Sequence, residues 1–279
     1  MKKLSVAVVL IIALVAVCSS FRPADARAGL NVVEITSELL PRAMNVNVTL
    51  PEAYDCDTTV RFPVVYLLNG HGGNNNSWGT VANLDSLATA HNFIIVCPDG
   101  MNSWYFDSPV RKDMQMESFI TGELLPFIDT HYRTLARPES RAITGLSMGG
   151  HGAMWLAMRH PDMFHNAGST SGGVDFTPWP GSWNIKDALG ERDNNPELWS
   201  SHTVASLVKG LKPGQLNIVF DCGTEDFFYE VNCALDSTLN AMRIPHRFST
   251  SPGAHNVAYW GKSIIPQLEF FAAHLNRQN

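Results

Sequence analysis

One serine stands between glycines in the stretch GLSMGGHGAM, which covers residues 145–154. The stretch follows a β-rich run, RAITGL, and leads into a segment whose apolar residues have helical spacing. Gly145, Ser147 and Gly149 thus match G-x-S-x-G in a strand, turn and helix context. Small neighbours let strand and helix approach each other around a strained serine. The pattern predicts that Ser147 is a nucleophile, and a capped helix start between chance glycines is the alternative.

Backbone N–H groups near this serine could stabilise an oxyanion. A helix that begins behind Ser147 favours negative charge at its N-terminus, and the Met148 N–H can donate to a developing oxyanion. A second donor is expected from the loop after an earlier strand, where LLNGHGGNNNSW is rich in glycine. The His71 N–H is the expected donor, with Gly72 beside it. No metal-binding partner stands at suitable spacing from the His71 side chain.

A serine hydroxyl needs a general base, and with this motif the chain order is serine, acid, histidine. Three histidines follow the last long β-rich run. His246 falls in an expected strand and His274 in the terminal helix, whereas His255 lies in the loop SPGAHN, free to reach the serine. His255 is therefore the expected base. His151 is nearer in sequence, but it lies on the nucleophile's own helix and precedes the acid.

The acid should come from the turn CGTEDFFYE. Asp226 stands where the turn becomes a helix, and backbone N–H groups at such a place keep a carboxylate ionised. Asp226 is the expected acid, and a simple helix cap is its other interpretation. Glu225 remains a rival because adjacent turn residues cannot be ranked without geometry. Asp221 is still inside the expected strand.

The order of strands and helices predicts an α/β fold. Continuous β-rich runs alternate with segments of helical periodicity, which is typical of a mostly parallel sheet covered by helices on both faces. These runs are residues 63–70, 93–100, 141–147 and 216–223. Residues 44–51 alternate like an antiparallel strand. Residues 172–195, with several Gly, Pro and Trp, predict a long excursion over one end of the sheet.

The N-terminus has the pattern of an export signal. Residues 1–26 have a basic start, a short apolar run and small residues before a cleavage point, so we expect a secretory signal peptide and a single domain over residues 27–279. Lipid attachment at Cys18 is the alternative. The expected location is periplasmic or extracellular, with no stable membrane span. Without residues 1–26 the net charge is −8, which argues against nucleic acid and anionic membranes as partners.

The remaining cysteines do not form a disulfide framework that could replace a core. Cys222 and Cys233 are close enough to pair across a strand-to-helix turn, and sequence leaves that pairing open. No cysteines have zinc-binding spacing. We expect neither a metal nor a cofactor.

Several motifs together resemble the esterase D family of α/β-hydrolases. They are LLNGHGGNNNSW, VCPDGMNSWYFDSP, ITGLSMGGHGAM, SGGVD, CGTEDFFYEVN and GAHN, in this order, over about residues 40–262. The family includes S-formylglutathione hydrolases, tributyrin esterases, feruloyl and acetyl-xylan esterases, and mycolyltransferases. The resemblance implies an α/β-hydrolase fold and Ser147, Asp226 and His255 as the catalytic triad. Many relatives have histidine at the position of Asn69.

The resemblance also implies an oxyanion hole from the backbone of Met148 and the His71 position. We expect the aromatic side chains of Trp78, Trp104 and Tyr105 to shape the substrate pocket, and Trp179 and Trp183 its rim. Core packing is the other interpretation of each.

The expected function is an exported serine esterase that acts on short-chain or carbohydrate-linked esters, with a small molecule or saccharide ester as its partner. An acyltransferase would use the same residues. A thioesterase like the S-formylglutathione hydrolases is disfavoured by the export signal, because that substrate is intracellular. A binding protein without activity would need a broken triad, and every candidate residue is present. The oligomeric state has no sequence signal.

Overall fold

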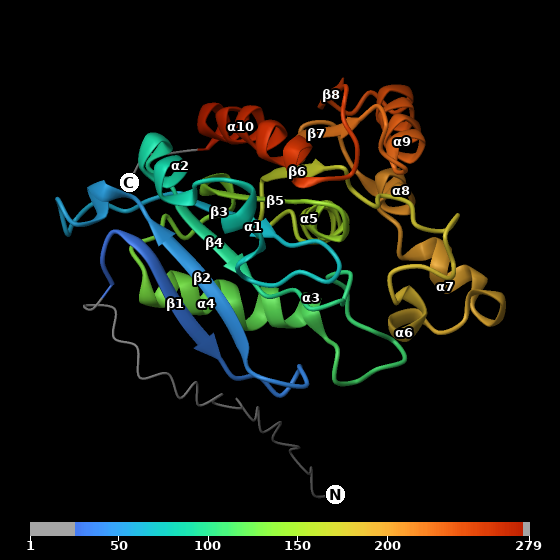
Figure 1. Ribbon diagram of the computed structural model, residues 1–279, viewed down its shortest axis with the longest axis horizontal. Helices are drawn as coiled ribbons and strands as arrows, with labels where there is room; N and C mark the ends of the chain where they lie inside the picture. The colour runs from blue at the N-terminus through green and yellow to red at the C-terminus, as the bar shows by residue number, and fades with distance from the viewer. Residues whose placement is uncertain (1–25, 276–279) are drawn as a thin grey trace, which may run out of the picture.

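An eight-stranded sheet lies at the centre of the protein, in the order β1-β2-β4-β3-β5-β6-β7-β8 (Figure 1). The structure, a computed structural model, describes residues 26–275. The first three strands of this order pair antiparallel and all later pairs are parallel. The strands are β1 Gly29–Ile35, β2 Met44–Leu50, β3 Val64–Leu68, β4 Ile94–Pro98, β5 Arg141–Gly145, β6 Asn166–Thr170, β7 Asn217–Gly223 and β8 Arg247–Ser251. The predicted fold class is confirmed.

Each β-rich run of the sequence forms a strand, but β1 and β6 were not predicted. The sequence of β6, NAGST, has no apolar run although all five residues are buried. Its two end residues bond to neighbouring strands, since Asn166 Nδ2 donates to the Arg141 carbonyl and Thr170 Oγ1 donates to Asp221 Oδ1. A buried strand that exchanges side-chain hydrogen bonds lacks the hydrophobic signal by which strands are recognised.

Helices cover both faces of the sheet (Figure 1). They are α1 Ser77–Val81, α2 Leu84–His91, α3 Met116–Phe119, α4 Leu125–His131, α5 Met148–Arg159, α6 Ile185–Leu189, α7 Pro196–Ser201, α8 Val204–Leu207, α9 Tyr229–Ala241 and α10 Val257–His274. Alternate residues of β3 pack against the helices on opposite faces of the sheet. Val64 and Tyr66 belong to the apolar cluster that includes α3, α4, α5 and α9, whereas Val65 belongs to the cluster with α1, α2 and α10.

The excursion begins after β6 and carries the short helices α6 and α7, which lie to one side of the sheet (Figure 1). Parallel pairing runs through five strands, β3, β5, β6, β7 and β8. The loops that follow their C-terminal ends therefore lie at the same end of the sheet. Every candidate catalytic residue follows one of these strands. The sheet thus assembles the site from segments far apart in sequence.

The structure describes almost none of the N-terminal segment that the sequence predicts to be a signal peptide. The expected signal peptide, except Ala26, lies outside the described residues, as does Cys18. Among residues 26–275, no helix has both the length and the apolar character needed to cross a membrane.

Cys222 and Cys233 are free thiols, so the disulfide that the sequence left open is not formed. Burial raises the pKa of the Cys222 thiol.

Candidate active site

The turn that holds Ser147 has the strained geometry expected of G-x-S-x-G. Ser147 lies between β5 and α5 with φ 57° and ψ −118°, a region that non-glycine residues rarely occupy. Its glycine neighbours are required by close backbone approach. A Cβ at Gly145 would lie 2.4 Å from the Gly149 carbonyl carbon, and a Cβ at Gly149 would lie 2.2 Å from the Leu68 oxygen. Strand, turn and helix can pack this tightly only without those side chains.

The structure brings Ser147, Asp226 and His255 into one hydrogen-bonded row. His255 Nε2 lies 2.9 Å from Ser147 Oγ, and His255 Nδ1 lies 2.8 Å from Asp226 Oδ2. Because a carboxylate only accepts hydrogen bonds, the proton of neutral His255 is on Nδ1 and Nε2 can accept from the serine hydroxyl. The Asp226 side chain is fully buried and the His255 side chain is 15% exposed. The histidine is thus oriented on one side and open to the serine on the other.

Asp226 is distinguished from its acidic neighbours by where its side chain points. Its Oδ1 accepts the Phe228 N–H at 2.9 Å and its Oδ2 lies 2.8 Å from His255 Nδ1, so both carboxylate oxygens have a hydrogen-bond partner. Glu225 is exposed. Asp221 is buried but bonds Thr170 and Gln267 instead, and burial raises its pKa. Geometry therefore ranks Asp226 above its rivals.

The other histidines considered have structural partners elsewhere. His246 Nε2 lies 2.8 Å from Asp236 Oδ1, and His274 Nδ1 lies 2.8 Å from the Phe270 carbonyl oxygen. His151 is fully buried, with its two ring nitrogens 3.0 and 2.9 Å from the carbonyl oxygens of Trp104 and His202. Burial lowers the pKa of His151 to about 4. A neutral ring donates to one of these two carbonyls, and neither nitrogen is directed to Ser147.

The loop of residues 69–73, here called the oxyanion loop, lies against the serine. A Cβ at Gly70 would lie 2.7 Å from Leu146 Cδ1 and 3.3 Å from Ser147 Cβ, so the loop closely approaches the serine turn at this glycine. Within the described chain, neither the His71 N–H nor the Met148 N–H donates to a protein acceptor. Met148 is also the first residue of α5, where the helix dipole favours negative charge. Both expected donors are therefore available to a substrate oxygen.

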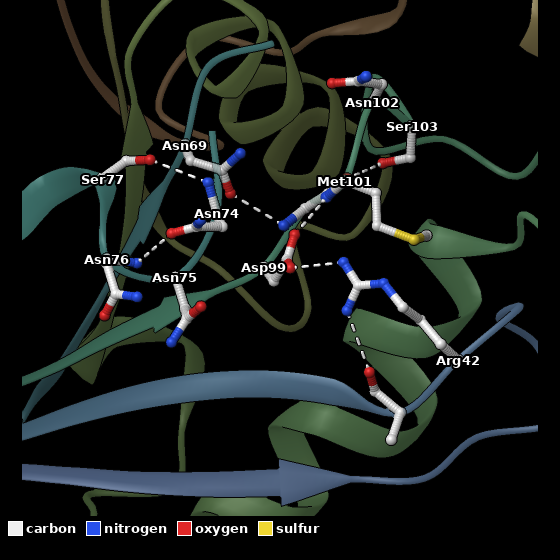
Figure 2. A network of polar contacts seen from close by, with 12 residues as sticks. Arg42, Asn69, Asn74, Asn75, Asn76, Ser77, Asp99, Met101, Asn102 and Ser103 are labelled. Atoms are coloured by element: carbon white, nitrogen blue, oxygen red, sulfur yellow. Dashed lines mark hydrogen bonds and ion pairs between the residues drawn. The ribbon is translucent and has the colours of Figure 1, made fainter. Parts of the chain in front are cut away.

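Asn69 holds the base of the oxyanion loop (Figure 2). Its Nδ2 donates to the Gly70 carbonyl at 2.9 Å, and its Oδ1 accepts the Gly100 N–H at 2.9 Å. The Tyr105 hydroxyl contacts the same Oδ1 at 3.0 Å. Farther along the loop, Gly72 N–H donates to Asn102 Oδ1 at 2.8 Å. Asn69 thus joins the loops after β3 and β4.

The loop after β4 has its own support (Figure 2). Asp99 Oδ1 accepts the Met101 N–H at 2.8 Å, and Asp99 Oδ2 pairs with Arg42 at 2.7 Å. The Ser103 hydroxyl donates to the Gly100 carbonyl at 2.7 Å. These contacts keep Gly100 where it meets Asn69.

Three of the five aromatic residues expected at the substrate pocket or its rim are buried, which corrects that expectation for these three. Trp78 packs in the core beside α10 and donates to the Leu68 carbonyl at 2.9 Å. Trp104 and Tyr105 are at most 1% exposed. Trp104 packs edge-on against Phe176 beneath the site. These side chains support the site from inside, because a large apolar surface is stabilised by leaving water.

The other two, Trp179 and Trp183, are half-buried, and their ring centroids lie 5.9 Å apart. Phe227 and Phe228 were not predicted. The Phe227 ring lies 4.3 Å from the His255 ring, centroid to centroid, and is 46% exposed. Phe228, the next residue, is fully buried, and no signal in the sequence distinguishes the exposed phenylalanine from the buried one.

Metal-ligating residues do not gather at this site. Over residues 26–275, no group of three or more His, Cys, Asp or Glu side chains could hold a metal ion. What the arrangement offers is a hydroxyl, an oriented imidazole and two free backbone donors. These groups are the requirements of acyl transfer through a covalent intermediate.

Comparison with solved structures finds the same architecture. A ferulic acid esterase superimposes with a TM-score of 0.77 at 24% identity, covering 90% of this chain and 99% of that one. The S-formylglutathione hydrolase of Agrobacterium tumefaciens gives a TM-score of 0.73 at 22% identity, covering 89% and 99%. At these identities the likeness is one of fold.

Comparison with sequences gives relatives named as esterases. An esterase of Mycobacterium tuberculosis is 30% identical over 239 residues, covering 75% of this chain and 52% of that protein. The chain thus spans about half the length of the mycobacterial relative. An acetyl esterase of Caldicellulosiruptor saccharolyticus is 27% identical over 222 residues, covering 75% of this chain and 82% of that protein. Residues 37–271 match the family described as "Putative esterase". Because this match spans most of the chain and includes the whole site, the protein belongs to that esterase family.

Proposed function

We propose that the protein is a serine esterase that hydrolyses carboxylic esters through an acyl-enzyme. One observation carries the proposal: Ser147 Oγ, His255 and Asp226 form a continuous row with contacts of 2.9 and 2.8 Å. A hydroxyl, a base and an orienting acid at hydrogen-bond distance make up the machinery of nucleophilic acyl transfer. The family match supports the same activity.

The mechanism follows from the positions of these atoms. Ser147 Oγ attacks the ester carbonyl carbon while His255 Nε2 takes the hydroxyl proton, and Asp226 stabilises the imidazolium. The N–H groups of His71 and Met148 hold the oxyanion of the tetrahedral intermediate. The intermediate collapses with cleavage of the bond to the alkoxy oxygen, which receives the proton from His255. Water, deprotonated by His255, then attacks the acyl-enzyme, and release of the acid regenerates Ser147.

The proposed substrates are short-chain esters or acetyl and feruloyl esters on carbohydrate. The names of two similar proteins, an acetyl esterase and a ferulic acid esterase, support this choice. The half-exposed aromatic rim beside His255, formed by Trp179, Trp183 and Phe227, supports an apolar or planar group on the substrate. A panel of acetyl, butyryl and feruloyl esters, with and without a xylan backbone, distinguishes these classes by kcat/KM.

The decisive test is Ser147→Ala. We expect the rate of p-nitrophenyl acetate hydrolysis to fall about 10⁵-fold, because the nucleophile itself is removed. Labelling by a fluorophosphonate probe should disappear while thermal unfolding stays that of a folded protein. Turnover close to that of the wild type would reject the assignment. Addition of an alcohol acceptor separates hydrolysis from transfer, since a transferase would form more new ester than free acid.

Export is a separate proposal that rests on the N-terminal sequence alone. Mass spectrometry of the protein recovered outside the cytoplasm should show a chain that begins at Arg27. A lipid-modified chain that begins at Cys18 would instead identify a lipoprotein.

A further inference from the structure

Two adjacent residues of the excursion, Trp183 and Asn184, contact the two segments on either side of Ser147: the turn that holds Asp226 and the oxyanion loop. The ring of Trp183 stacks on Phe227 in the acid turn, with centroids 5.4 Å apart and planes inclined by 20°. The next residue, Asn184, reaches the oxyanion loop, where its Oδ1 lies 2.9 Å from His71 Nε2. Adjacent residues therefore contact both the acid side and the oxyanion side of Ser147.

The backbone at this place is strained. Trp183 and Asn184 have φ of 51° and 55°, in the left-handed region. Asparagine tolerates this conformation, but tryptophan rarely adopts it, and such strain persists where the surroundings enforce it. Trp104, itself at φ 56°, donates from Nε1 to the Trp183 carbonyl at 3.2 Å. The segment is thus held in an unfavourable conformation directly above buried aromatic packing.

The direction of the Asn184 contact follows from its second partner. Asn184 Nδ2 donates to Asp187 Oδ2 at 2.9 Å, which leaves the amide oxygen facing His71. An oxygen acceptor requires a proton on His71 Nε2. The His71 side chain is therefore the donor in a bond between the oxyanion loop and the excursion.

We propose that Asn184 is a positioning residue: through the His71 side chain it holds the oxyanion loop so that the His71 N–H faces the developing oxyanion. This inference rests on the esterase function proposed above. The loop is held on its other side by Asn102, which accepts the Gly72 N–H at 2.8 Å. The excursion thus contributes to catalysis without touching the substrate's reacting atoms.

The expected size of the effect is intermediate. Removing an oxyanion donor costs about 10²–10³ in kcat. The contact between His71 and Asn184 is exposed, and Asn69 and Asn102 also hold the loop, so its loss displaces the donor only part of the time. We expect kcat to fall about five- to tenfold, with KM little changed, because the oxyanion forms only after substrate binds.

Two single variants and their combination test the positioning role. Asn184→Gly removes the amide oxygen and keeps a residue that adopts φ 55° without strain. His71→Ala removes the donor and leaves the backbone N–H in place. Each should lower kcat by the same factor, and the double variant should be no slower than the slower single variant. His71→Gln, which keeps an N–H donor, should recover most of the lost rate.

A second measurement separates positioning from loss of structure. The affinity of a boronic acid that forms a tetrahedral adduct on Ser147 should fall by the same factor as kcat/KM, because that adduct uses the same donors. Thermal midpoints should stay within about a degree or two of the wild type, because an exposed hydrogen bond contributes little to stability.

The matched control is Lys186→Ala, which removes an exposed ion pair with Glu191 inside the excursion. Its kcat should equal that of the wild type.

The outcomes distinguish the two proposals. Unchanged kcat in Asn184→Gly, or losses that multiply in the double variant, would overturn the positioning role while Ser147 remains labelled by a fluorophosphonate. An equal loss in Lys186→Ala would also overturn it, because any loosening of the excursion would then suffice. Failure of the wild type to react at Ser147 would instead reject the esterase function itself.

Discussion

The two flanks of Ser147 are built in different ways. On the acid flank, Asp226 and His255 act through their own side chains, with direct contacts of 2.8 and 2.9 Å. On the oxyanion flank the expected groups are backbone N–H donors, and side chains such as Asn69 and Asn102 only hold the loop that carries one of them. A side-chain function can be removed by one substitution, whereas a backbone function can only be displaced. Substitutions on the acid flank should therefore cost far more activity.

The largest effect expected from this comparison is that of Asp226→Asn. The amide would present an N–H to His255 Nδ1 and favour the tautomer that cannot accept the serine proton, so kcat should fall about 10³–10⁴-fold. Steady-state kinetics on p-nitrophenyl acetate measures the loss. Glu225→Gln is the matched control, since this neighbour is exposed, and its kcat should stay within about twofold of the wild type. A larger loss in Glu225→Gln than in Asp226→Asn would reverse the assignment of the acid.

A second prediction concerns His151, which is fully buried on the helix that follows Ser147 and contacts the Trp104 carbonyl. Burial lowers the pKa of His151 from 6.5 to about 4, so between these values the unfolded chain binds a proton that the folded protein does not. The stability contribution is complete above pH 6.5 and falls as the pH drops toward 4. Between pH 7 and pH 5 this residue should cost about 2 kcal/mol of the free energy of unfolding.

Urea denaturation of the wild type and of His151→Gln at both pH values measures that contribution. The glutamine side chain does not titrate, so the variant should lose less stability than the wild type on acidification, whatever its stability at pH 7. Equal losses in the two proteins would show that His151 does not carry the acid sensitivity.

The smallest effect should come from Tyr105→Phe on the oxyanion flank. The variant keeps the ring, which packs against Gly100 and Gly152, and removes the hydroxyl that contacts Asn69 Oδ1 at 3.0 Å. Because Asn69 retains its bond to Gly100, kcat should fall only about three- to tenfold with KM unchanged. Tyr66→Phe is the control, since the Tyr66 hydroxyl has no hydrogen-bond partner among the described residues. A loss above about 10²-fold would make the oxyanion flank as sensitive as the acid flank.

Prediction from sequence succeeded where local signals and topology agree. Continuous β-rich runs identified β3, β4, β5 and β7, because most positions of a strand buried on both faces are apolar. Glycine spacing identified the turn at Ser147, because a Cβ at Gly149 or Gly145 would lie only 2.2 or 2.4 Å from backbone atoms. Strand β6 was missed because its burial is balanced by hydrogen bonds to neighbours rather than by apolar side chains.

The aromatic residues show what local signals leave undecided. Trp78, Trp104 and Tyr105 stand in the same loops as site residues, yet all three are buried. Phe227, which looks like a core residue by type, is 46% exposed beside His255. Residue type is a poor guide to direction in a loop, because no periodicity relates neighbouring side chains to an inside or an outside.

The sequence by itself determined the α/β order of elements, the strained serine turn and the short set of acids and histidines that could serve it. The tertiary structure decided which members of that set meet, because the Asp226 side chain is directed to His255 whereas Glu225 is exposed. It also decided that Asn69, Asn102 and Asn184 hold the oxyanion loop. Those contacts join segments up to 113 residues apart, and the packing of the whole sheet brings them together.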